Sequence, residues 1–122
     1  MNKRVLVIED TEDNRQILRD LLSAAGYEVI EATDGATGVA MALDRHPDLI
    51  LMDIQIPVLD GYEATRRIKA APSTRHIPIV AVTSYALVGD EARTRDAGCD
   101  GYVAKPFSPR QLLKKVREFI GD

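Results

Sequence analysis

Short apolar runs that end on polar residues recur along this chain, and stretches of helical periodicity separate them. Five runs predict strands, at residues 5–8, 28–32, 49–52, 77–82 and 101–104. The run from Leu49 to Met52 has no polar alternation, which is typical of a strand buried on both faces of a parallel sheet. Apolar residues at helical spacing predict five helices, at about residues 13–25, 36–43, 62–70, 91–97 and 109–120.

Turn and cap residues agree with these bounds. Gly26 follows the first predicted helix, and Pro47 ends the second. Ser108 caps the last helix, with Pro109 at its first position. Strands that alternate with helices predict an α/β fold, in which a parallel sheet carries helices on both faces. The 122 residues, 45% of them hydrophobic, suggest one domain over 1–122 with a core of ordinary size.

Composition excludes several classes of function. The net charge is −3 and no basic block stands out, so we expect no nucleic-acid partner. No apolar run approaches the ~18 residues of a membrane span, and the first residues turn acidic too early for a signal peptide. The single cysteine, Cys99, excludes an internal disulfide framework and fits a reducing compartment. We therefore expect a cytoplasmic protein without membrane association.

Polar side chains stand where four of the predicted strands end. Glu9 and Asp10 follow the first strand, Asp53 the third, Thr83 the fourth and Lys105 the fifth. The carboxyl ends of parallel strands meet at one edge of a sheet, where ligands collect, so we expect these five side chains to lie together. A carboxylate that ends a strand can also cap the following turn, but that alternative explains one residue at a time.

The side chains at this edge favour phosphate chemistry with a metal ion. Three clustered carboxylates raise one another's pKa unless a cation lies among them. Mg²⁺ prefers one or two carboxylates together with a phosphate and waters. The amine of Lys105 and the hydroxyl of Thr83 suit phosphoryl oxygens. One carboxylate could then act as a nucleophile and hold an acyl phosphate.

Four stretches together resemble the receiver domain of two-component response regulators. They are V-L-V-I-E-D from Val5, D-L-I-L-M-D-I-Q-I-P-V-L-D-G from Asp48, I-V-A-V-T-S from Ile79 and Y-V-A-K-P-F from Tyr102. Each alone is weak, but all four in this order are very specific. The resemblance covers residues 3–120 and implies a doubly wound, flavodoxin-like sheet with the strand order 2-1-3-4-5. The stretches H-I-P-I-V-A-V-T and G-D-E with a later G-C are also similar to a cell-division regulator of this family.

The resemblance also implies roles for the residues at the sheet edge. Asp53 would accept a phosphoryl group from a histidine kinase or a histidine phosphotransfer protein. Mg²⁺ would be held by Asp10, Asp53 and the backbone carbonyl of Gln55, with Glu9 acting through water. Thr83 would bind the phosphoryl oxygens.

Further implied roles concern the fifth strand. Lys105 would bind the phosphoryl oxygens with Thr83, and the Lys105–Pro106 peptide bond is a candidate for the cis form. Tyr102 matches the family's switch aromatic. An inward movement of Thr83 would vacate space beneath the fourth helix, where we expect a loosely packed loop at 85–89, and Tyr102 could then turn from an outward to an inward rotamer. Downstream partners would then read the face formed by the fourth helix, the fifth strand and the fifth helix. Because no output domain follows, we expect a single-domain regulator.

Two alternatives come from other classes of protein. A metal-dependent phosphatase of the haloacid dehalogenase type also uses an aspartyl nucleophile, but it needs a second Asp two residues later, where this chain has Gln55. A receiver-like adaptor could bind its partners without phosphate, although the intact acidic set argues against an inactive site.

Overall fold

The computed structural model describes residues 2–83 and 90–121. Its strands and helices alternate along the described chain. The strands are β1 (Arg4–Ile8), β2 (Glu28–Ala32), β3 (Leu49–Asp53), β4 (Ile79–Thr83) and β5 (Gly101–Ala104). The helices are α1 (Glu12–Ala24), α2 (Gly35–Arg45), α3 (Gly61–Ala70), α4 (Asp90–Ala97) and α5 (Pro109–Ile120).

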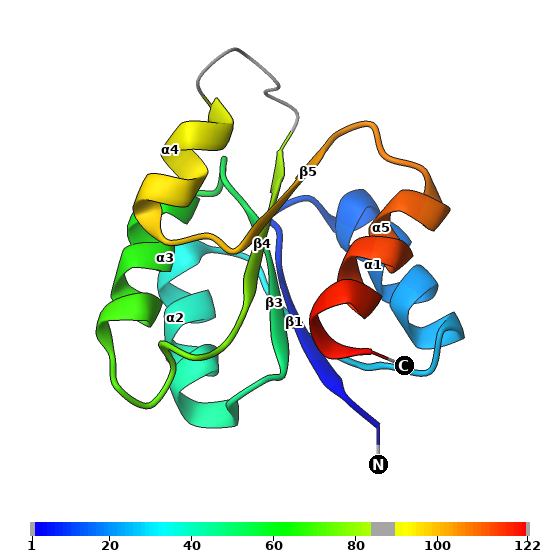
Figure 1. The fold of residues 1–122 in the computed structure, drawn as a ribbon, viewed down its shortest axis with the longest axis horizontal. Coiled ribbons are helices and arrows are strands. Elements are labelled where there is room, and N and C mark those ends of the chain that lie inside the picture. Colours follow the sequence, from blue (N-terminus) through cyan, green and yellow to red (C-terminus); the bar gives the residue numbers. More distant parts are fainter. Residues whose placement is uncertain (1, 84–89, 122) are drawn as a thin grey trace.

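The strands form one parallel sheet in the order β2-β1-β3-β4-β5. The predicted fold class and strand order are therefore confirmed. Figure 1 shows α2, α3 and α4 on one face of the sheet and α1 and α5 on the other. The carboxyl ends of the strands point upward in this view, toward the loops that lead into the helices.

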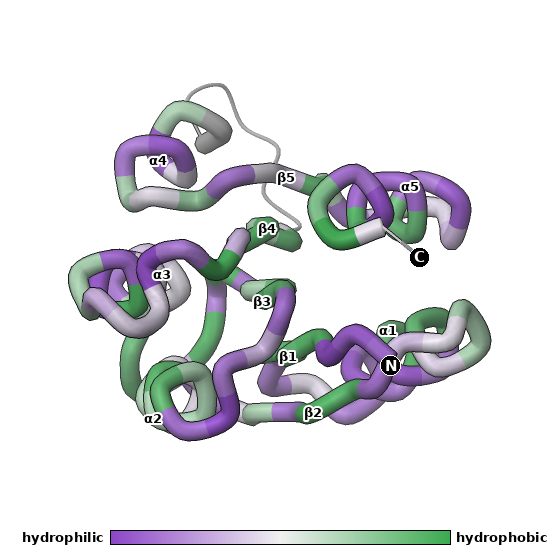
Figure 2. The backbone as a smooth tube through the Cα atoms, turned by 60° about the horizontal axis from the view of Figure 1, so that its bottom comes forward, coloured by the Kyte–Doolittle hydropathy of each residue, from purple (hydrophilic) through white to green (hydrophobic). Residues whose placement is uncertain are grey.

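Each face of the sheet has its own apolar core. Ile8, Ile50 and Met52 belong to the core beneath α2 and α3, whereas Val7 and Leu51 belong to the core beneath α1 and α5. Neighbouring strand residues point to opposite faces, so a strand buried on both faces is apolar at every position. Figure 2 shows the hydrophobic colour along the central strands and mixed colour along the helices around them.

Local chemistry moves some element bounds by one or two residues. β4 begins at Ile79 rather than at Ile77, because the Ile77 amide turns back to the carbonyl of Thr74 at 3.0 Å. Pro78 has no amide hydrogen and contributes only its carbonyl, which accepts a bond from Ile50. The predicted cap at Ser108 is present as a capping box with Gln111.

Three further predictions concern a cis peptide bond, membrane-spanning helices and the loop before α4. The Lys105–Pro106 peptide bond is cis. Among the described residues, no helix is both long enough and apolar enough to cross a membrane. The loop expected at 85–89 lies outside the described residues.

Candidate functional site

The residues predicted at the strand ends meet at the carboxyl edge of the sheet. Asp53 is the last residue of β3, and Thr83 is the last residue of β4. Glu9 and Asp10 come directly after β1, and Lys105 comes directly after β5. Because β1, β3, β4 and β5 are neighbours in the sheet, these four strand ends form one continuous site.

The three carboxylates lie close enough together to share a ligand. One carboxylate oxygen from each of Glu9, Asp10 and Asp53 lies within 4.8 Å of the others. Glu9 is only 1% exposed and Asp53 is 8% exposed, whereas Asp10 is open to solvent. The cluster therefore has a buried floor made of two acidic groups and an exposed rim at Asp10.

Lys105 reaches into this cluster from β5. Its Nζ lies 2.9 Å from Oε1 of Glu9 and 3.7 Å from Oδ2 of Asp53, so its hydrogen bond goes to Glu9. The second oxygen of Glu9, Oε2, is buried and has no hydrogen-bond partner among the described residues. A buried carboxylate oxygen without a donor is costly, and a bound cation or water would relieve that cost.

The two buried acids have pKa values that are shifted in opposite directions. Burial, followed by the neighbouring Glu9, raises the pKa of Asp53 to about 7. Burial also raises the pKa of Glu9, but hydrogen bonds from Asp53 and Lys105 outweigh it and lower that pKa to about 2. As the pH rises, Glu9 therefore loses its proton well before Asp53 does. Burial and the neighbouring Glu9 thus raise the pKa of Asp53, and Lys105 is the cation that helps to lower the pKa of Glu9.

Backbone groups fix the orientation of Asp53 and the position of Lys105. The amide of Gln55 donates to Oδ1 of Asp53 at 3.1 Å, while the Gln55 side chain is exposed. The amide of Lys105 donates to the carbonyl of Thr83 at 2.7 Å, which ties the ends of β4 and β5 together. Thr83 itself is 2% exposed. The site therefore rests on the sheet rather than on free loops.

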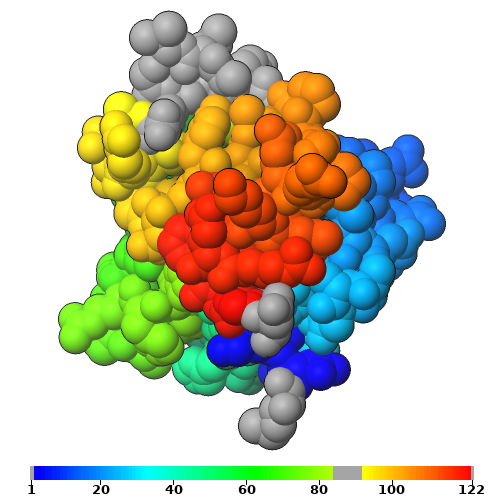
Figure 3. Space-filling view, turned by 45° about the vertical axis from the view of Figure 1, so that its right-hand side comes forward, coloured from blue at the N-terminus to red at the C-terminus, as the bar shows by residue number. Residues whose placement is uncertain are grey.

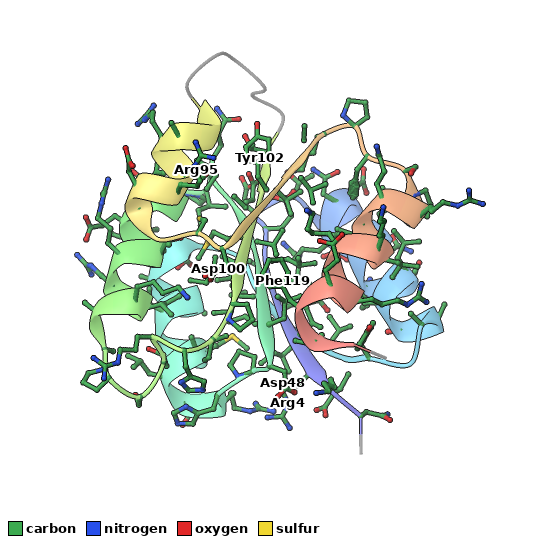
Figure 4. All side chains as sticks on the ribbon, in the orientation of Figure 1. Arg4, Asp48, Arg95, Asp100, Tyr102 and Phe119 are labelled. Atoms are coloured by element: carbon green, nitrogen blue, oxygen red, sulfur yellow. The ribbon has the colours of Figure 1, made fainter. Side chains whose placement is uncertain are left out.

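Tyr102 lies on β5 and is half-buried against the core beneath α2 and α3. Figure 4 labels it beside β5, on the side of α4. Next to it, a hollow of about 370 Å³ is lined by residues of β5 and α5, among them Lys114 and Glu118. Figure 3 shows α4, β5 and α5 side by side on one face of the molecule.

The donor set fits a hard divalent cation. Carboxylate oxygens are the ligands that Mg²⁺ prefers, and Asp10 leaves the rim open for water. The Oε2 of Glu9, which has no partner in the described part of the chain, is an acceptor that a metal-bound water can satisfy. With Asp53 ionised, Lys105 is the one cation among the described residues that pairs with these carboxylates, so a second positive charge would balance them.

One residue near the site was not identified from the sequence. The guanidinium of Arg15 donates to the backbone carbonyls of Glu9 and Asp10, at 3.0 and 3.1 Å. Its sequence signal was only a basic residue on the first turns of an acidic helix, three positions after Glu12. That spacing favours an ordinary pair within the helix and does not indicate contacts with the preceding loop.

Comparison with known proteins identifies the class that this fold and site define. The family model for the response regulator receiver domain matches residues 5–117. The chain belongs to the response regulator receiver domain family. Receiver domains are signalling proteins rather than classical enzymes, so the alternative of a dehalogenase-type phosphatase is not supported.

Individual relatives cover the whole chain. The polar-differentiation response regulator DivK of Brucella ovis is 43% identical over 122 residues, which are 100% of this chain and 99% of that protein. DivK of Brucella anthropi is also 43% identical, with the same coverage. DivK is the regulator that the shorter stretches resembled, and that resemblance is confirmed.

Solved structures agree with the relatives. The receiver domain of sensor histidine kinase PA1611 from Pseudomonas aeruginosa has a TM-score of 0.93 and 38% identity, with 100% of both chains covered. That structure has a magnesium ion coordinated in its active site cleft. The chemotaxis response regulator CheY4 of Vibrio cholerae has a TM-score of 0.92 and 29% identity, with 98% of this chain and 99% of that chain covered.

Proposed function

We propose that this chain, as a single receiver domain over residues 1–122, is a phosphorylation-dependent switch. Asp53 accepts a phosphoryl group from a histidine kinase or a histidine phosphotransfer protein. The phosphorylated form signals through altered contacts with a downstream protein. The chain assists its own phosphorylation and dephosphorylation and has no other substrate.

One observation carries this proposal: a nearly buried aspartate at the edge of the sheet faces both a lysine and two further acids. The Gln55 amide holds Oδ1 of Asp53, and Oδ2 lies on the side of Lys105. In the transfer, an oxygen of Asp53 bonds to phosphorus as the bond from phosphorus to the donor's imidazole nitrogen breaks. The bonding electron pair leaves with that nitrogen, and an acyl phosphate remains.

The surrounding side chains would stabilise the transferred group. Lys105 supplies a positive charge that can move from Glu9 to a phosphoryl oxygen on Asp53, because its Nζ lies 2.9 Å from Oε1 of Glu9 and 3.7 Å from Oδ2 of Asp53. The hydroxyl of Thr83, at the neighbouring strand end, would donate to a second oxygen. Asp53 must be ionised to attack, so its proton has to leave before transfer.

The residues at this edge would also hold Mg²⁺. Asp10, Asp53 and the backbone carbonyl of Gln55 would bind it directly, and Glu9 would bind through water. When bound, Mg²⁺ neutralises negative charge on the transferring phosphoryl group. The magnesium ion in the PA1611 receiver domain supports this assignment.

The proposed output surface is the face formed by α4, β5 and α5 (Figure 3). The amide of Lys105 bonds the carbonyl of Thr83, so movement at the end of β4 is coupled to β5, which carries Tyr102. An inward movement of Thr83 toward the phosphoryl group would change the room available to Tyr102, and the hollow beside it would change shape. Partners that recognise this face would then distinguish the two states.

The direct test is incubation with acetyl phosphate and Mg²⁺, followed by intact-protein mass. We expect the wild type to gain one phosphoryl group and Asp53→Ala to gain none. Asp60→Ala is the matched control, since Asp60 only caps α3 through the amide of Glu63. Asp10→Ala and EDTA should both reduce labelling. Equal labelling of Asp53→Ala and wild type would exclude Asp53 as the acceptor, and no labelling of any protein would favour the phosphate-independent adaptor.

The coupling has its own test in Thr83→Ala. The variant should still be phosphorylated on Asp53 but should bind a phosphate-dependent partner at least about fivefold more weakly than the phosphorylated wild type, a typical allosteric coupling. Equal affinity, together with an unchanged Tyr102 rotamer, would exclude this route of signalling.

A further inference from the structure

We propose that Arg15 is a positioning residue for the acidic loop between β1 and α1. Its guanidinium holds the backbone that carries Glu9 and Asp10, so that their carboxylates face Asp53. This inference rests on the proposed function, because it concerns the metal site that serves phosphorylation.

The contacts of Arg15 join three parts of the fold. Its Nη1 donates to the carbonyls of Glu9 and Asp10, at 3.0 and 3.1 Å. Its Nη2 pairs with Glu12 in the first turn of α1, and its Nε lies 3.4 Å from Glu31 of β2. The side chain is only 12% exposed, so these bonds are partly shielded from water. The three nitrogens of a planar guanidinium can bond to acceptors in several directions at once, whereas the single amine of a lysine cannot reach all of them.

The backbone of the loop is thereby held from two sides. The amide of Glu9 donates to the carbonyl of Ala32 at 3.0 Å, which extends the pairing of β1 with β2 by one residue. The carbonyl of Glu9 is then taken by Arg15. Thr11 caps α1 without a side-chain hydrogen bond, so the helix start itself adds no side-chain bond at this point. Arg15 therefore supplies the bond that orients the peptide between the two acids.

Arg19 is a natural control one turn further along α1. It pairs with the same two carboxylates, at 2.9 Å to Glu31 and 3.5 Å to Glu12. Its side chain is 35% exposed, and its hydrogen bonds to described residues go to side chains, not to the loop carbonyls. Loss of either arginine removes one positive charge from the same ion cluster, but only loss of Arg15 frees the loop.

The test compares Arg15→Met, Arg15→Lys and Arg19→Met in three measurements. The first is Mg²⁺ affinity by calorimetric titration of the full chain. The second is amide hydrogen exchange at residues 9–11 in EDTA, which needs neither metal nor phosphate. The third is thermal unfolding, which shows whether each variant is folded.

We expect Arg15→Met to bind Mg²⁺ about tenfold more weakly, the usual effect of losing a group that orients a metal ligand. Exchange at residues 9–11 should be about tenfold faster. Arg19→Met should stay within about twofold of wild type in both, and Arg15→Lys should recover part of the affinity. If Arg15→Met does not fold, Arg15→Lys against Arg19→Met decides the question.

Equal losses in Arg15→Met and Arg19→Met would overturn the proposal, because charge alone would then explain them. Wild-type exchange and affinity in a folded Arg15→Met would overturn it as well. Failure of the wild type to bind Mg²⁺ or to become phosphorylated would instead contradict the proposed function, while the exchange data would still judge the positioning role.

Discussion

Two lysines have nearly the same exposure but very different surroundings. The amine of Lys69, on α3, lies at the amino ends of β4 and β5, here called the amino edge of the sheet, and Lys105 lies at the opposite, carboxyl edge. Lys69 is 20% exposed, and its amine donates to the carbonyls of Arg75 and Ile77 and to Oδ2 of Asp100, at 3.2, 2.8 and 2.8 Å. Lys105 is 21% exposed, and it has one short hydrogen bond, to Glu9. Figure 4 shows Asp100 at the lower end of β5, opposite to the end that leads to Lys105.

The carboxylates beside the two lysines also differ in how well their hydrogen-bonding capacity is satisfied. Asp100 also accepts the amide of Ile79, so it is bonded to both a lysine and the first residue of β4. Glu9 is buried with one oxygen unpaired among the described residues, and Asp53 next to it has a pKa of about 7. The amino edge is thus built to stabilise the fold. At the carboxyl ends, the buried Oε2 of Glu9 has no hydrogen-bond partner among the described residues, which is typical of a site that binds a ligand.

The largest expected effect on stability comes from replacing Lys69 at the amino edge. Lys69→Met should lower the free energy of unfolding by about 3 kcal/mol, because three acceptors lose their donor together. Urea unfolding measures this loss. Phosphorylation of the folded variant by acetyl phosphate should be unchanged.

The matched variant at the other edge is Lys105→Met. Its loss of stability should be less than half as large, because Lys105 has one short bond and Asp53 can share a proton with Glu9. A loss equal to that of Lys69→Met would show that the two edges contribute alike, and the comparison would fail.

The second prediction adds Mg²⁺ instead of removing a side chain. At a concentration tenfold above its dissociation constant, Mg²⁺ should stabilise the wild type by about 1.4 kcal/mol through mass action. Thermal unfolding over a magnesium titration measures the gain. Asp10→Ala should lose most of it, whereas Asp100→Asn, which is less stable from the start, should keep it. Equal stabilisation of Asp10→Ala and wild type by Mg²⁺ would show that the metal does not bind at this acidic cluster.

The third prediction concerns the buried charge of Asp53. In metal-free buffer at pH 8, Asp53→Asn should be about 1 kcal/mol more stable than wild type, because the ionised carboxylate is buried and is also repelled by Glu9. At pH 5 the difference should be smaller, since Asp53 is then protonated in the folded wild type, and it should shrink further down to pH 4. Denaturant unfolding in EDTA at a series of pH values measures both.

The direction of this pH dependence follows from the two shifted acids. The pKa of Asp53 is raised from 3.8 to about 7, so its contribution to stability is complete below pH 4 and is lost as the pH rises through 7. The pKa of Glu9 is lowered from 4.5 to about 2, so its contribution is present above pH 4.5 and is lost only as the pH falls through 2. Between pH 5 and 8, Asp53 alone of this pair changes its contribution. A difference that grows toward low pH would contradict this assignment.

The sequence predicted the fold and the grouping of polar residues at the carboxyl ends of the strands, because both follow from the pattern of burial. Every position of β3 and β4 is buried, so their apolar runs are long enough to identify and end where the polar site residues begin. It did not predict which carboxylate accepts the hydrogen bond of Lys105. That depends on the small difference between the distances from its Nζ to Oε1 of Glu9, 2.9 Å, and to Oδ2 of Asp53, 3.7 Å. Nor did it predict which acid keeps the proton, because that depends on how deeply each is buried and on its donors. Arg15 was missed for a similar reason, as its key acceptors are backbone carbonyls.

The smallest expected effect concerns backbone strain, which also differs between the two edges. Val58, in the loop after β3, has a φ of 70° and is 83% exposed, while its neighbours Pro57 and Leu59 close a tight turn with a 2.8 Å bond from amide to carbonyl. This conformation is strained for a β-branched residue. At the amino edge, His46 ends α2 with a φ of 46°, which histidine tolerates better.

Val58→Gly should therefore raise the free energy of unfolding by about 0.5 kcal/mol, with relief of strain partly offset by the greater freedom of glycine when unfolded. His46→Gly should give no measurable gain, and urea unfolding of both variants measures the contrast. A loss of stability in Val58→Gly would mean that the valine side chain contributes packing here, and strain would then not distinguish the two edges.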